Sequence, residues 1–170
     1  MSIRNTVAVA KAISADIAIE IGPPEEGAAA NTQQVIMMSL VKDTRGYVTK
    51  IANQINGAYE HGWYDACAVM IRRLIETLII ECFERHDIAD NIKGSTGDFL
   101  YLRDLIDKTV KETAWNLGRN TKTALPKLKD IGDKSAHSRR YIALRGDIQP
   151  LLLDIRTVVQ ELLFLSELKK

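Results

Sequence analysis

Apolar residues recur every three or four positions along most of this chain, which is the spacing that buries one face of a helix. The strongest pattern spans Tyr64–Arg85, where aliphatic and sulfur-containing side chains repeat on one stripe and further isoleucines broaden it. We expect a central helix there that is buried on most sides. A weaker helical pattern covers residues 3–21, although three isoleucines between 17 and 21 also alternate as in a strand.

Glycine and proline residues divide the first third of the chain. Residues 22–27 hold two prolines between glycines and predict a linker after the first helical segment. A second apolar pattern runs over 31–59, with a break expected at Gly46. We therefore divide the chain into an N-terminal helical arm with its linker, residues 1–30, and a helical bundle over residues 31–170.

The second half of the chain predicts further helices that are separated by turns. Residues 94–97 predict a turn, whose serine, threonine or following aspartate is available to cap the next helix, near 102–110. A loop is expected over 115–123, and Pro126 suits the first turn of a short helix because that turn needs no N–H there. A last helix is expected over 147–168. Five or six helices without a clear strand predict an all-α bundle.

The composition agrees with one soluble helical domain. The chain has 170 residues, of which 46% are hydrophobic, enough for a single core. No apolar run approaches the roughly 18 residues of a membrane span, so we expect no membrane association and a cytoplasmic location. Cys67 and Cys82 would lie about 22 Å apart on one helix, too far for a disulfide, and predict buried reduced thiols.

Positive charge is concentrated between residues 119 and 145, where eight lysines and arginines stand against two aspartates. The whole chain, by contrast, has a net charge of only +1. A local cationic surface suits a phosphodiester substrate or a nucleic-acid backbone. The residues expected to contact phosphate are Lys129, Lys134, Arg139 and Arg140.

His137, one of three histidines, stands four residues after Asp133 in this basic stretch. Residues at that spacing share one side of a helix, and a carboxylate beside an imidazole holds one tautomer and raises the histidine pKa. His137 is therefore a candidate general base, with Asp133 as its orienting partner. The alternative is a structural role in which His137 caps a helix or forms a hydrogen bond at a helix junction. His61 and His86 stand at segment ends, where surface or capping roles are expected.

Arg72, Arg73 and Glu76 place charges on the otherwise apolar central helix. One of the two arginines is expected to pair with Glu76 in a structural ion pair, because a charge at the edge of a core needs a partner. Gly132 and Ala136 are four residues apart and would let a neighbouring helix approach closely. No metal-ligand spacing, phosphate-binding glycine loop or dinucleotide motif is present, so we expect no metal and no cofactor.

Two motifs stand in order along the chain, Gly62–Glu76 and Ile131–His137. The first, an aromatic start that leads into Arg-Arg-Leu-Ile-Glu, resembles the first core helix of a HEPN-like domain of unknown function. The second, Ile-Gly-Asp-Lys-Ser-Ala-His, resembles the Gly-Asn-x-x-Ala-His element before the last helix of that family. The resemblance covers residues 47–168. It implies a four- to five-helix bundle, often a homodimer, in bacterial and archaeal defence, toxin–antitoxin and restriction systems.

Active HEPN proteins are metal-independent ribonucleases that use an arginine a few residues before a histidine, usually paired across a dimer. The resemblance implies that His137 is that histidine and that the arginine would fall within 130–132, where the chain has Asp-Ile-Gly. The cation that would stabilise the transition state is thus missing. Asp133 also replaces the usual asparagine and adds negative charge beside the phosphate position.

Three functions follow from these features. We favour a non-catalytic or regulatory HEPN-like module that binds RNA or DNA, a nucleotide or a partner protein. The first alternative is a weak metal-independent ribonuclease in which His137 is the base and Lys129, Arg139 or Arg73 supplies the cation. The second alternative is a structural oligomerisation domain.

Overall fold

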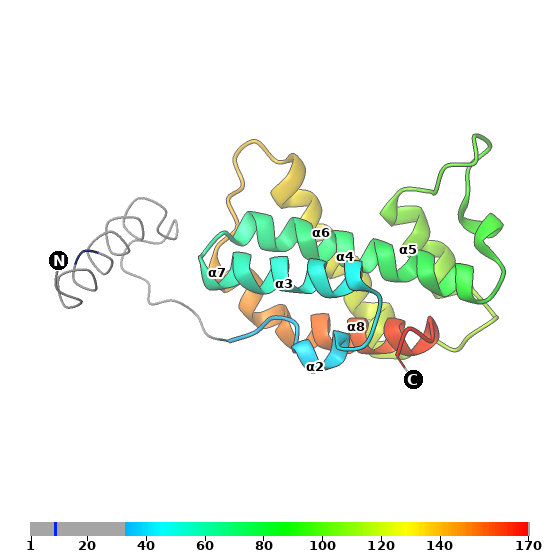
Figure 1. Ribbon diagram of the computed structural model, residues 1–170. Helices are drawn as coiled ribbons and strands as arrows, with labels where there is room; N and C mark the ends of the chain where they lie inside the picture. The colour runs from blue at the N-terminus through cyan, green and yellow to red at the C-terminus, as the bar shows by residue number, and fades with distance from the viewer. Residues whose placement is uncertain (1–8, 10–32, 170) are drawn as a thin grey trace.

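The computed structural model describes Val9 and residues 33–169 (Figure 1). The helix expected over 3–21 and the linker after it lie outside the described residues, except for Val9. The described elements are helices, and the one β-type contact among them is an isolated bridge between Lys93 and Phe99. The all-α prediction is confirmed. None of these described helices is long and apolar enough to cross a membrane.

The helices follow one another with short connections. In chain order they are α2 (Met38–Val41), α3 (Gly46–Glu60), α4 (Tyr64–Arg85), the 3₁₀ helix η1 (Ala89–Ile92), α5 (Leu102–Lys111), α6 (Arg119–His137), α7 (Arg145–Ile148), the 3₁₀ helix η2 (Gln149–Leu151) and α8 (Leu152–Leu165). The break predicted at Gly46 is confirmed, since α3 begins there. The helix predicted over 147–168 is formed by the consecutive α7, η2 and α8.

Helix α4 lies at the centre of the bundle and packs against α3, α5, α6 and α8 (Figure 1). Its apolar stripe is wide, as the sequence pattern predicts, and Leu74 and Leu78 are fully buried. Cys67 and Cys82 are buried and unpaired, and burial raises the pKa of each thiol to about 12. Both cysteines therefore remain protonated thiols at neutral pH.

Helix α6 begins earlier than its local sequence predicts. The predicted loop is confirmed for residues 115–118 but wrong for 119–123, and the helix start predicted at Pro126 is wrong, because α6 begins at Arg119 and contains the proline. The carboxylate of Glu161 on α8 accepts the Gly118 N–H at 2.5 Å and also a threonine hydroxyl of the first turn. A carboxylate on a distant helix thus satisfies the backbone N–H of Gly118, the residue just before the helix. Pro126 is exposed, and its ring lies outside the core.

The start of α5 also differs from its prediction. Its N-cap residue is Tyr101, and no side chain caps the helix, so the capping predicted for Ser95, Thr96 or Asp98 is wrong. The Thr96 hydroxyl instead donates to Asp98 Oδ2 at 2.8 Å within the turn.

Helices α4 and α6 approach each other closely at Gly132. A Cβ atom at this position would lie 2.6 Å from Arg72 Cβ and 3.1 Å from the Ala68 carbonyl oxygen. The first distance is shorter than any normal carbon–carbon contact, so a side chain here would push the two helices apart. The close approach predicted for Gly132 is confirmed, whereas Ala136 is exposed.

Replacing Gly132 with alanine should lower the free energy of unfolding by about 1–2 kcal/mol, because overpacking outweighs the better helix propensity of alanine. Urea unfolding of the variant measures this change. Gly57→Ala is the matched control, since nothing lies within 4 Å of a Cβ there. It should stabilise α3 by about 0.5–1 kcal/mol. Equal effects of the two substitutions would contradict the steric argument.

Candidate functional site

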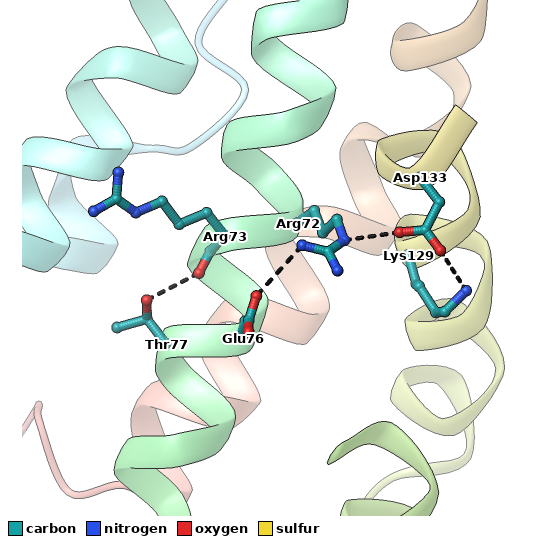
Figure 2. Close-up of polar contacts among 6 residues, drawn as sticks. All are labelled: Arg72, Arg73, Glu76, Thr77, Lys129 and Asp133. Carbon is teal, nitrogen blue, oxygen red and sulfur yellow. Dashed lines mark hydrogen bonds and ion pairs between the residues drawn. The ribbon is translucent and has the colours of Figure 1, made fainter. Parts of the chain in front are cut away.

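The candidate residues lie on α6, on the facing side of α4, and on the connection from α6 to α7. Asp133 is the centre of the polar contacts between the two helices (Figure 2). Arg72 Nε donates to Asp133 Oδ1 at 2.8 Å, and Lys129 Nζ donates to Asp133 Oδ2 at 2.6 Å. Arg72 Nη1 also lies 3.5 Å from Glu76 Oε2. Four charges thus alternate in sign along one line from α4 to α6.

These contacts determine the charge state of Asp133. Partial burial opposes its ionisation, but the hydrogen bonds and positive charges of Lys129 and Arg72 outweigh that effect and lower the pKa of the carboxyl below its ordinary value. Asp133 is therefore ionised at neutral pH, and two cations already compensate its charge. It adds little net negative potential to the surface beside it.

His137 is the last residue of α6 and is exposed. Within the described part of the chain it has no hydrogen bond or ion pair, and Asp133 binds Arg72 and Lys129 instead. The structure therefore does not bring together the predicted base and its predicted orienting partner. The alternative role, in which His137 fastens a helix junction, has no contact to support it either. The imidazole is free to rotate in solvent.

The four cations predicted to contact phosphate fall into two pairs. Lys129 is half-buried beside Asp133, and Lys134 Nζ lies 3.2 Å from Asp130 Oδ2 in an exposed i,i+4 pair. Arg139 and Arg140 are exposed and have no ion pair with any residue that the structure describes. The uncompensated positive charge therefore lies just beyond the end of α6.

The two arginines of the central helix have different surroundings. Arg72 forms the predicted pairing with Glu76, whereas Arg73 is exposed and extends away from Asp133 (Figure 2). The Thr77 hydroxyl donates to the Arg73 carbonyl oxygen at 2.9 Å, so this contact involves the backbone of Arg73 and not its guanidinium group. Arg73 therefore points away from Lys129 and Asp133 on α6 (Figure 2).

Hydrogen bonds hold the connection from α6 to α7 in place at the end that leads into α7. The buried Ala143 donates its N–H to Asp65 Oδ1 at 3.0 Å, and Leu144 donates its N–H to Asp147 Oδ2 at 2.9 Å. Burial and the nearby carboxylates of Asp147 and Asp65 raise the pKa of Tyr141 to about 12. The exposed arginines thus stand on a short segment held at α6 on one side and at the start of α4 on the other.

Sequence reasoning did not identify the turn between α3 and α4 as part of this region. Trp63 is 41% exposed and stacks on His61, with ring centroids 5.1 Å apart and an interplanar angle of 26°. His61 is the C-cap residue of α3, as expected of a capping histidine, and its Nδ1 lies 2.8 Å from the Gly57 carbonyl oxygen. The sequence shows the histidine and the tryptophan on either side of Gly62, but only the fold brings Asp65, two residues after the tryptophan, into contact with Ala143 of the α6–α7 connection.

Among the described residues, no group of three or more histidine, cysteine, aspartate or glutamate side chains is placed to hold a metal ion. Comparison of the chain with protein-family models, with curated proteins and with solved structures finds no match. The HEPN-like resemblance therefore rests on its two sequence motifs and stays a prediction.

Replacing Asp133 with asparagine should lower the free energy of unfolding by about 1–2 kcal/mol at neutral pH, since the negative charge is lost and the amide offers one acceptor oxygen where the carboxylate offers two. The lowered pKa of Asp133 stabilises the fold above the unfolded value of about 4, and this contribution is lost as the pH falls through the folded value. The difference between wild type and variant should therefore shrink on acidification. Urea unfolding across a pH series measures it.

Asp130→Asn provides the control, because it removes a carboxylate from the exposed pair with Lys134. We expect a change of at most about 0.5 kcal/mol. A loss as large as that of Asp133→Asn, or a difference that grows in acid, would show that the Arg72–Asp133 contact does not stabilise the protein.

Proposed function

We propose that this protein is a non-catalytic HEPN-like module that binds the phosphate backbone of a nucleic acid through the connection from α6 to α7. The observation that carries the proposal is the pair of exposed arginines, Arg139 and Arg140, without carboxylate partners in the described chain. Guanidinium groups suit phosphate because they donate parallel hydrogen bonds to two oxygens. The motif resemblance extends the proposal to a homodimer in a defence or toxin–antitoxin setting.

The charges around this segment support an anionic ligand. Asp133 is already paired with two cations, and Asp65 and Asp147 accept backbone N–H groups of the connection. The nearby carboxylates are thus occupied by contacts within the protein, while the arginines are not. Phosphate contacts of this kind supply affinity and position rather than sequence preference.

The same geometry argues against catalysis. Among the described residues His137 has no partner that fixes its tautomer, and no arginine stands at 130–132 to stabilise charge on a phosphorane. A general base without orientation and without an opposing cation contributes little rate enhancement.

Arg139→Gln/Arg140→Gln should weaken binding to RNA and to DNA roughly tenfold at moderate salt and make the salt dependence of binding shallower, because two phosphate contacts are lost. Fluorescence anisotropy with labelled oligonucleotides at several salt concentrations measures both effects.

Lys108→Gln/Lys111→Gln is the control with the same change in net charge, since both lysines are exposed on α5 at the other end of the bundle (Figure 1). It should leave binding nearly unchanged. Equal losses in the two double variants would indicate a diffuse charge effect and contradict a site. Wild type that binds no polyanion would leave a partner protein or oligomerisation as the function.

Incubation of the purified protein with mixed RNA in the presence of a chelator tests the non-catalytic part of the proposal. No cleavage above a buffer blank is expected. Cleavage that His137→Ala abolishes would contradict this part and support the weak-ribonuclease alternative.

A further inference from the structure

We propose that the nucleic acid bound here is single-stranded, and that one unpaired base stacks on Trp63 while Arg139 and Arg140 hold neighbouring phosphates. This inference rests on the proposed function and names its ligand class. It begins from a partly exposed aromatic pair in the turn between α3 and α4, His61 and Trp63.

Trp63 is held in position although it is exposed. Gly62 adopts φ = 75°, a left-handed conformation that glycine favours, and the Trp63 N–H donates to the Ala58 carbonyl oxygen at 2.8 Å. Stacking on His61 supports one side of the indole. The ring therefore needs little further ordering when a ligand binds, which favours affinity.

The turn that holds the aromatic pair lies next to one end of the cationic connection. Asp65, two residues after Trp63, accepts the Ala143 N–H at 3.0 Å, so the start of α4 touches the end of that connection. Arg140 stands three residues before Ala143. Figure 1 shows the turn between α3 and α4 next to the descending part of the α6–α7 connection, which projects beyond the bundle.

The combination of a stacking ring with uncompensated cations is typical of surfaces that bind single strands. Cations follow the backbone, and each base that stacks on an aromatic ring typically contributes tenfold or more in affinity. A duplex keeps its base faces inside its own stack, so it can use the arginines but not Trp63. Ile142 and Leu144, which are 67% and 53% exposed, add apolar surface on the same connection.

Three labelled probes test the proposal: an oligouridylate, the matching oligothymidylate and a blunt RNA duplex. Trp63→Ala should weaken binding to the single strands about tenfold, leave the salt dependence unchanged and leave duplex binding unchanged. Trp63→Phe should retain most of the affinity because it keeps a ring. Single strands should also quench tryptophan fluorescence in wild type and not in Trp63→Ala, since the second tryptophan, Trp115, is buried.

Two further variants separate the loss of the aromatic ring from effects on folding. Trp63→Leu keeps apolar bulk without a ring and should lose the same affinity as Trp63→Ala. Tyr101→Ala removes an aromatic side chain that is 83% exposed at the start of α5 and should change nothing. The single strand that wild type binds more tightly identifies RNA or DNA as the ligand, and a loss in Trp63→Ala on that strand supports the proposal.

Several results would overturn the inference. Single-strand binding that Trp63→Leu leaves intact, or an equal loss on the duplex, would exclude base stacking. Association of the protein with itself that depends on Trp63 would assign the ring to a protein interface. If Arg139→Gln/Arg140→Gln loses binding while the Trp63 variants do not, the proposed function stands and the stacking inference alone fails.

Discussion

The contact between α4 and α6 at Gly132 is the constraint on which the rest of the structure depends. The missing side chain lets the stem of Arg72 lie against α6, which brings Arg72 Nε within 2.8 Å of Asp133. The ion pair is half-buried, so its value depends on this geometry more than on charge alone. A larger residue at position 132 would disturb packing and electrostatics together.

The same contact determines which charges are available at the surface. Asp133 engages Arg72 and Lys129, and neither cation is then free to meet a phosphate. Of the four cations predicted to contact phosphate, only Arg139 and Arg140, beyond the end of α6, have no ion pair with a described residue. For the same reason His137 lacks the carboxylate that a catalytic histidine needs. The proposed binding role and the absence of a catalytic arrangement thus have one structural cause.

Periodicity predicted the elements that their own side chains stabilise. The sequence-based bounds of α4, Tyr64–Arg85, match the structure because a long apolar stripe determines that helix locally. The start predicted for α6 was wrong because the carboxylate that holds the actual start, at Gly118, belongs to Glu161, forty-three residues further along the chain. Local patterns contain no information about such a partner. The predicted pairing of Asp133 with His137 failed for a similar reason. The spacing of the two residues allowed the contact, but Arg72 on another helix binds Asp133 instead.

The sequence by itself determined the helical class, the central helix and the basic stretch, because each depends on neighbours within a few residues; it also marked Gly132 and the two cysteines by residue type, as a small residue and as apolar thiols on the helical stripe. Only the tertiary structure decided which charges are compensated and that the start of α4 contacts the α6–α7 connection. These features depend on distances between helices that are far apart along the chain. Hydrogen bonds between such distant segments, for example from the Ala143 N–H to Asp65, form only when the core has packed.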